Sequence, residues 1–192
     1  MYSAVAVRRV LRLVPAIALL LLAVSPAAAQ SLPEPRTWTV TPFLHTSLGI
    51  GDPAPDNSLG LGVAVAYDWT ANLAFEGEVS HLFDVAGDNA AIDWSVSNFS
   101  GNAVYHFDTQ KVTAYATLGL GVEVSNQDVK ESDALALLAD FSATEIAINF
   151  GGGAKYRINN RWMARADIRR FQANDLAPDY WRLYGGLTFR LR

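Results

Sequence analysis

The feature that most constrains the fold is an alternation of side-chain character with a period of two, which is sustained over residues 142–170. In the segment SATEIAINFGGGAKYRI, one parity is mostly apolar, whereas the other mixes charged residues with Gly and Ala. After Asn159-Asn160, the segment RWMARADIRR continues the alternation. This period predicts two β-strands, and the Asn pair predicts the turn of a hairpin. Such strands fit either a soluble sheet or a closed barrel that stands in a membrane.

The only continuous apolar run lies near the start of the chain. Arg8, Arg9 and Arg12 precede LVPAIALLLLAV, and an Ala-Ala-Ala segment ends at Ala29. A basic region, a short apolar region and small residues predict a secretory signal peptide over 1–29. The alternative, an uncleaved anchor, needs about 20 apolar residues. We therefore expect a lead-in over 30–36 and one domain over 37–192.

Composition excludes several classes of function. Cysteine is absent, so the chain has neither disulfides nor cysteine-ligated metals. The 15 basic and 19 acidic residues become an excess of about seven acidic groups once cleavage removes three arginines, which argues against nucleic acid as a partner. No phosphate loop, dinucleotide fingerprint or metal-spaced cluster is present, so neither a cofactor nor a metal site is expected.

Alternation recurs along the rest of the chain. The predicted strands cover 37–49, 59–69, 73–83, 92–107, 112–124, 142–158, 161–170 and 180–191. The longest predicted loop is 125–141, and its segment DALALLADF is compatible with a short helix. Because long and short connections alternate, we predict an eight-stranded antiparallel up-and-down transmembrane β-barrel with three short periplasmic turns and four longer extracellular loops.

Aromatic residues gather at the short-turn ends of the predicted strands, as an interfacial girdle would. The predicted girdle consists of Trp38, Tyr67, Trp69, Tyr105, Phe107, Tyr156, Trp162 and Phe189. The face that carries the charges is rich in Gly and Ala, which suits a narrow lumen better than a solvent surface. A soluble lipocalin-like ligand-binding barrel, with an apolar interior, remains the alternative.

The inward-facing charges are predicted to form a lumen network. Its members are Glu76, Glu78, Glu123, Glu145, Lys155, Arg157, Arg165, Asp167, Arg169 and Arg190. Side chains nearly fill an eight-stranded barrel, and an unpaired buried charge costs several kcal/mol. We therefore expect a salt-bridged plug, with a small gated pore as the alternative if the ion pairs rearrange.

At this point the chain resembles the small outer-membrane β-barrel family typified by the transmembrane domain of outer membrane protein A. The resemblance rests on the signal peptide, WTVTPFLHTSLG, NAVYHF, YATLGLGVEV, GGGAKYRI with RWMARADIRR, and YGGLTFRLR. It implies a monomer in the outer membrane of a Gram-negative bacterium, surrounded by lipid and lipopolysaccharide and inserted by the barrel-assembly machinery. It also implies a structural or surface-interaction role through the long loops.

Catalysis is the second hypothesis, because some eight-stranded outer-membrane barrels deacylate lipid A with a Ser-His-acid arrangement. His45 and Ser47 share one face of the first predicted strand, as a base and a nucleophile do. No acid is identifiable beside them, and His81 and His106 have no evident partners. We therefore expect no catalytic site, and a lipid A-modifying enzyme remains the alternative.

Overall fold

The computed structural model describes residues 33–49, 58–83, 92–107, 112–129, 141–173 and 179–191. Its regular elements are the strands β1 (Thr37–Gly49), β2 (Leu59–Asp68), β3 (Leu73–Leu82), β4 (Ile92–His106), β5 (Thr113–Val129), β6 (Phe141–Arg157), β7 (Trp162–Ala173) and β8 (Tyr180–Leu191). Among these residues there is no helix of the length and apolarity that a membrane span requires.

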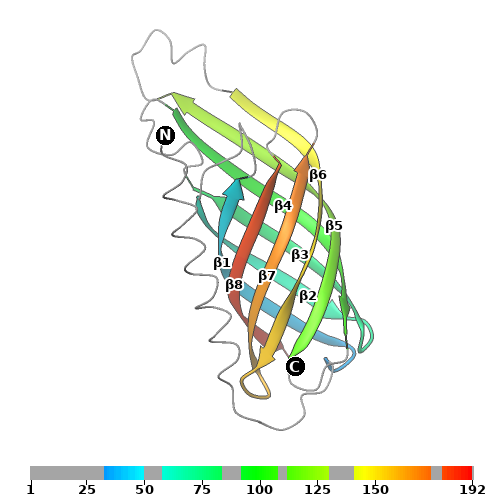
Figure 1. The fold of residues 1–192 in the computed structure, drawn as a ribbon. Helices are drawn as coiled ribbons and strands as arrows, with labels where there is room; N and C mark the ends of the chain where they lie inside the picture. The colour runs from blue at the N-terminus through cyan, green and yellow to red at the C-terminus, as the bar shows by residue number, and fades with distance from the viewer. Residues whose placement is uncertain are drawn as a thin grey trace.

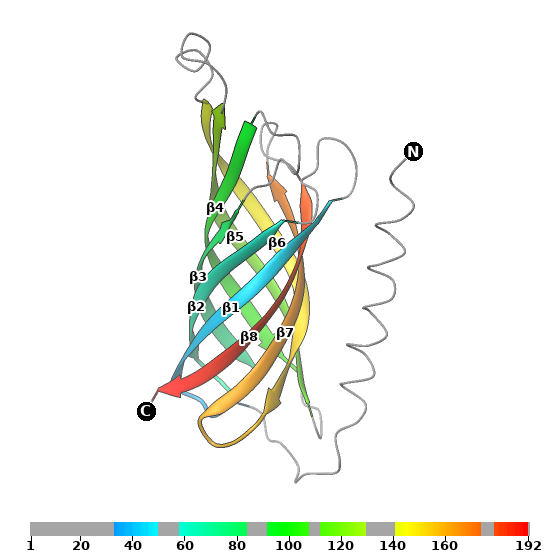
Figure 2. The same ribbon diagram turned by 90° about the vertical axis from the view of Figure 1, so that its left-hand side faces the viewer.

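The eight strands form one closed barrel in sequence order (Figure 1). Each strand pairs antiparallel with its neighbours, and β1 pairs with β8 to close the cylinder. The strands are inclined to the long axis, and the C-terminus lies at the same end as the β6–β7 turn (Figure 2). The predicted eight-stranded antiparallel barrel is therefore confirmed.

The wall of the barrel is apolar outside, and its interior is mainly polar and charged, with small apolar clusters such as Leu82, Val96 and Phe171. Leu44 is 70% exposed, whereas Arg169 and Arg182 are completely buried. Side chains alternate between the two faces along each strand, so one parity meets the surroundings and the other fills the lumen. This distribution rules out the soluble lipocalin-like alternative, whose interior is apolar.

Two of the short turns are closed by side-chain acceptors. In the β6–β7 turn, Asn159 Oδ1 accepts the backbone N–H groups of Arg161 (2.8 Å) and Trp162 (2.9 Å). In the β2–β3 turn, Thr70 Oγ1 accepts the N–H of Leu73 (2.9 Å). Both are the turn-residue chemistry that holds a strand reversal in a fixed register.

Three neighbouring strands rise beyond the others at the loop end (Figure 2). The β4–β5 ladder continues to the pair Ile92–Val129 and the β5–β6 ladder to Gln127–Phe141. The β3–β4 ladder stops at Leu82–Val96, and the β6–β7 ladder at Ala147–Ala173. We call residues 92–95, 125–129 and 141–146 the β4–β6 extension; among the described residues, each of its two outer strands has a ladder on one side only.

Three predicted boundaries were wrong. The loop predicted at 125–141 begins only after Val129, and Phe141 already belongs to β6; Gln172 and Ala173 likewise belong to β7. The outward apolar residues of β5 end at Val124, although the strand itself continues beyond the apolar band on the outer face of the barrel. The alternation of apolar residues therefore marks only part of each strand. The segment DALALLADF, in which a short helix was predicted, covers 133–141; residues 133–140 lie outside the described residues, and Phe141 begins β6.

The β1–β8 seam has an interruption in its ladder. Val40 pairs with Phe189 and the next recorded pair is Phe43–Gly186, so Thr41 and Pro42 are skipped. Proline has no N–H to donate to a ladder. Inside the barrel, Thr41 Oγ1 and Thr188 Oγ1 lie 2.8 Å apart and join the two strands by a side-chain hydrogen bond.

Candidate functional site

The charged side chains of the lumen gather between β3, β7 and β8. Glu76 and Glu78 are two residues apart on β3, and Arg165, Asp167 and Arg169 follow the same spacing on β7. Because the side-chain period of a strand is two, each set points to the same side, which is the lumen. All five are buried.

Arg165 is bound to two acids and one phenol. Its guanidinium forms a two-pronged ion pair with Glu76, in which Nη1 contacts Oε2 and Nη2 lies 3.2 Å from Oε1. Its Nε donates to the Tyr115 hydroxyl (2.7 Å), which in turn donates to Asp167 Oδ2 (2.5 Å). The paired geometry fixes the guanidinium plane as well as its charge.

Arg169 connects three carboxylates. Its Nε donates to Asp167 Oδ1 (3.0 Å), its Nη2 to Glu76 Oε1 (2.9 Å), and its Nη1 to Glu78 Oε2 (3.3 Å). The Tyr184 hydroxyl accepts a further bond from Nη2 (3.3 Å). Arg169 therefore ties β3 to β7 across the barrel.

Arg182 completes the group and was absent from the predicted network. Its Nη2 lies 2.5 Å from Glu78 Oε1, its Nη1 donates to Ser80 Oγ (3.1 Å), and its guanidinium lies 4.4 Å from the Phe171 ring centroid. Its parity on β8 is that of the inward Tyr184, and this signal identifies it as a lumen residue. We call Glu76, Glu78, Asp167, Arg165, Arg169 and Arg182 the lumen charge cluster.

The cluster contains three cations and three anions and is electrically balanced. Removal of one partner from such a buried group leaves an uncompensated charge, which costs about 3–5 kcal/mol. The arginines also lie over aromatic rings; the Arg165 guanidinium, for example, is 4.8 Å from the Tyr115 ring centroid. The side chains of the cluster and the aromatic rings beside them together fill the middle of a narrow barrel.

Two predicted members of the network lie inside the barrel but bind other partners. Glu123 Oε1 accepts hydrogen bonds from the Tyr180 hydroxyl (2.7 Å) and from Asn98 Nδ2 (3.2 Å). Lys155 Nζ lies 2.9 Å from His106 Nε2. The statement that His106 lacks a partner was therefore wrong.

The remaining predicted members lie at the margins. Arg190 Nη1 pairs with Glu34 Oε1 of the lead-in (3.2 Å), and both Glu145 and Arg157 are half-buried. No group of three or more His, Cys, Asp or Glu side chains in the described parts of the chain is arranged to hold a metal ion.

The part of the lumen wall between β3 and β7, on β4, β5 and β6, is polar but mostly uncharged. Asn102, Gly119 and Asn149 lie in one row of the sheet. Asn149 Nδ2 donates to Asn102 Oδ1 (2.9 Å) directly above the glycine, and a Cβ at position 119 would collide with both amides. A side chain at position 119 would therefore have to displace the two amides, and glycine leaves room for their close approach.

The predicted aromatic girdle faces outward at the turn end. Ring pairs join neighbouring strands: Trp38 and Tyr67 have centroids 4.9 Å apart, and Trp162 and Phe189 4.8 Å apart. Tyr105 and Phe107 form a third pair at 5.3 Å, and Trp69 packs against Tyr67 at 6.2 Å. Tyr156 is partly exposed on the same parity.

His45 and Ser47 are both buried in the lumen. Ser47 Oγ accepts the backbone N–H of Ser58 (3.2 Å) and makes no hydrogen bond with His45 within the described residues. A different histidine lies within hydrogen-bond distance of a serine: His81 Nδ1 and Ser97 Oγ are 2.9 Å apart on the outer surface. The statement that His81 lacks a partner was also wrong.

Comparison with known proteins agrees with this architecture. The family model described as "Outer membrane protein beta-barrel domain" matches residues 15–189. No curated protein sequence matches the chain.

Several solved structures are similar. Neisserial surface protein A has 16% identity and a TM-score of 0.66, over 80% of this chain and 97% of that one. The N-terminal β-barrel domain of Pseudomonas aeruginosa OprF has 15% identity and a TM-score of 0.61, over 82% and 98%. Ail, the attachment invasion locus protein of Yersinia pestis, has 14% identity and a TM-score of 0.56, over 81% and 97%. At these identities the likeness shows the fold alone.

Proposed function

Because the chain belongs to the outer membrane protein beta-barrel domain family, we propose that it is a non-enzymatic barrel with a closed lumen that acts at the cell surface. Membership of the family means that the barrel stands in the outer membrane of a Gram-negative bacterium. The lumen charge cluster is the observation that carries the proposal.

A closed lumen is supported by the geometry of the cluster. Arg169 joins acids on β3 and β7, and Arg182 extends the contacts to β8, so ion pairs cross the interior. A solute that passed this level would have to separate buried charges, each of which costs several kcal/mol when left unpaired. An eight-stranded barrel has little further space to offer.

Absence of catalysis is supported by the two residues that suggested it. His45 and Ser47 are enclosed in the lumen, without the mutual hydrogen bond that activates a nucleophile. A lipid substrate would approach the barrel from outside, where neither side chain is exposed. The lipid A-modifying alternative therefore has no support at this pair.

A role at the cell surface is supported by the β4–β6 extension. Within the part of the chain that the structure describes, its outer strands pair on one side only, and unpaired strand edges are recognised by other extended chains. One similar structure is named a surface protein and another an attachment invasion locus protein. We propose lipid, lipopolysaccharide and, during insertion, the barrel-assembly machinery as the chain's other partners, and a monomer as its state.

Two measurements on one pair of proteins test the proposal. The first protein is the full chain, and the second has residues 127–141 replaced by Asn-Gly, which shortens the β5–β6 hairpin. We expect both to resist detergent until boiled and to show no steady conductance in planar bilayers. We expect cells that carry the shortened protein to attach to surfaces less than cells that carry the full chain.

Each half of the proposal has its own contrary result. Regular conductance steps from the full chain at neutral pH would show that the lumen is open. Equal attachment by cells that carry either protein would remove the surface role from the extension.

A further inference from the structure

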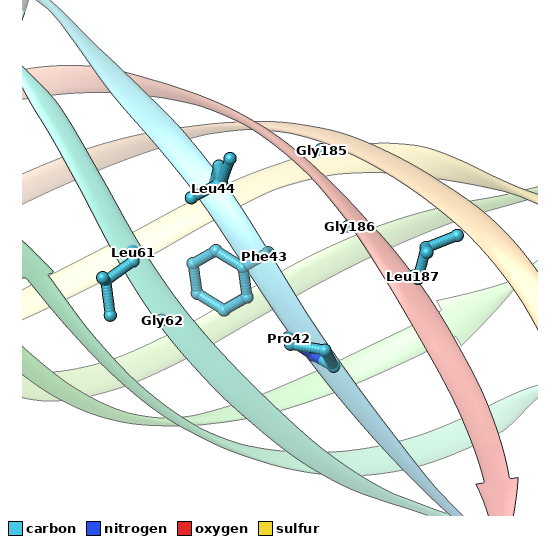
Figure 3. Close-up of a pocket in the computed structure, with 8 residues that line it drawn as sticks. All are labelled: Pro42, Phe43, Leu44, Leu61, Gly62, Gly185, Gly186 and Leu187. Atoms are coloured by element: carbon cyan, nitrogen blue, oxygen red, sulfur yellow. The ribbon is translucent and has the colours of Figure 1, made fainter.

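The outer wall of the barrel is not uniformly convex, because a hollow of about 550 Å³ lies across β8, β1 and β2 (Figure 3). Leu44, Leu61 and Leu187 stand around it, and Pro42 forms part of its side. Gly185 faces outward and has no atom near the place of a Cβ, so β8 presents no side chain at this level. The missing side chain and the short proline ring create the depression.

A second hollow of about 250 Å³ continues in the same direction across β2, β3 and β4. Leu61 and Gly62 line both. The second hollow is apolar along Val63, Val79 and Phe99, but its opposite edge holds His81 and Ser97.

The register of the sheet shows that the two hollows form one groove. Its upper edge is a single row of paired residues, in the order Gly185, Leu44, Leu61, His81 and Ser97. Its lower edge is the row Pro42, Val63, Val79 and Phe99. With strands about 4.8 Å apart, the four steps of the upper row span about 19 Å, which is the length scale of a fatty acyl chain.

The groove also climbs through the membrane. Gly185 lies four residues above the girdle residue Phe189, whereas Ser97 lies eight residues above Tyr105. Eight strand residues rise about 26 Å along the strand, or roughly 20 Å along a barrel axis inclined by 40°. The Gly185 end is thus at mid-membrane, and the His81–Ser97 end is at the extracellular interface.

We propose that this groove binds one acyl chain of lipid A, the lipid anchor of lipopolysaccharide, with an oxygen of that lipid on the His81–Ser97 pair. The apolar part of the groove matches the chain. The His ring and the Ser hydroxyl match a hydroxyl, ester or phosphate oxygen, which lies at the level of the interface. The inference rests on the proposal above that lipopolysaccharide surrounds the barrel, and it names the place of contact.

The groove offers two substitutions with matched controls. Gly185→Leu fills the first hollow, and Gly77→Leu adds the same side chain at another outward glycine with open space that lines neither hollow. Ser97→Ala removes the hydroxyl that meets His81, and Ser95→Ala removes a partly exposed serine two residues away on the same face. Detergent resistance before boiling verifies that all four variants fold.

Native mass spectrometry of the purified full chain, titrated with lipid A or with phosphatidylethanolamine, measures the binding. We expect lipid A to bind the unaltered chain more tightly, and each groove variant to weaken it about five-fold or more, while the controls leave it unchanged. Equal binding of both lipids, or no difference between groove variants and controls, overturns the assignment. Neither result alters the conductance or attachment tests of the proposed function.

Discussion

Where β3 faces β7 and β8 across the lumen, each member of the charge cluster has an oppositely charged neighbour. The β4–β5–β6 side carries mostly amides, hydroxyls and glycines, and its buried charges are Glu123 and Lys155. Several polar atoms of the second side have no protein hydrogen bond within the described residues. They include Asn98 Oδ1, Ser100 Oγ, Asn102 Nδ2, Thr117 Oγ1, Glu123 Oε2 and Asn149 Oδ1. In the charge cluster, Glu78 Oε1 and Arg182 Nη2 form an ion pair without a hydrogen bond between them.

The contrast shows how the free-energy cost of an unpaired buried group determines whether that group must have a partner. An unpaired buried ion costs several kcal/mol, so the charged side depends on ion pairs between bulky side chains. An unpaired neutral group costs about 1–3 kcal/mol at most, and less where solvent reaches it. The neutral side can therefore leave some hydrogen-bonding groups without partners, and Gly119 leaves room for the paired amides of Asn102 and Asn149.

The largest effect should follow the loss of Arg169. We expect Arg169→Met to lower the free energy of unfolding by about 3–5 kcal/mol, because Glu76, Glu78 and Asp167 lose a shared cation. The control is Arg170→Met, the next residue, which faces outward and pairs with the partly exposed Asp179; its cost should stay below about 1 kcal/mol. Urea titration of the barrel in lipid vesicles measures both.

Similar losses in these two variants would show that the cluster is not a special source of stability. In that case the charged side would be no more dependent on pairing than the outer surface. The comparison between the two sides of the lumen would then fail at its strongest point.

An intermediate effect should follow from adding a side chain at Gly119, where two amides already occupy the space. We expect Gly119→Val to cost about 2–3 kcal/mol, because the added side chain displaces the Asn102 and Asn149 amides from their mutual hydrogen bond. Gly101→Val is the control, since Gly101 faces outward into open space. A control loss as large as that of Gly119→Val, in the same urea titration, would mean that strand propensity rather than the amide pair sets the cost.

The smallest and most selective effect compares two inward serines. Ser80 Oγ accepts a hydrogen bond from Arg182, whereas Ser100 Oγ has no protein partner within the described residues. We expect Ser80→Ala to cost about 1.5 kcal/mol and Ser100→Ala less than about 0.5 kcal/mol. A larger loss of stability for Ser100→Ala than for Ser80→Ala would contradict the view that polar groups are paired on the charged side and unpaired on the neutral side.

Parity in the sequence was enough to predict the strands and the direction of their side chains. It separated Glu76 and Arg165 from the outward leucines, because every second residue faces the same side. It could not predict that Arg165 meets Glu76 while Lys155 meets His106, since these contacts depend on the height of each residue across the closed barrel. Arg182 was overlooked although its parity is correct.

Boundaries were harder to predict than faces. β5 was expected to end near Val124, where outward apolar residues stop, but the strand runs to Val129. Beyond the membrane a strand no longer needs an apolar outer side, so its amino-acid pattern loses the signal although its backbone pairing continues. The same reasoning applies to the last residues of β7.

The interruption of the β1–β8 ladder at Thr41 and Pro42 has a consequence for biogenesis. Every other strand pairing joins neighbours in the chain, but this closure brings together Thr41 and Thr188, 147 positions apart. Contacts between such remote residues bear the largest loop-closure entropy and tend to form late. Until β1 and β8 pair, both strands have free edges that can pair with other polypeptides. The β1–β8 seam, whose ladder is interrupted, is therefore also the place where the folding barrel is most exposed to mispairing.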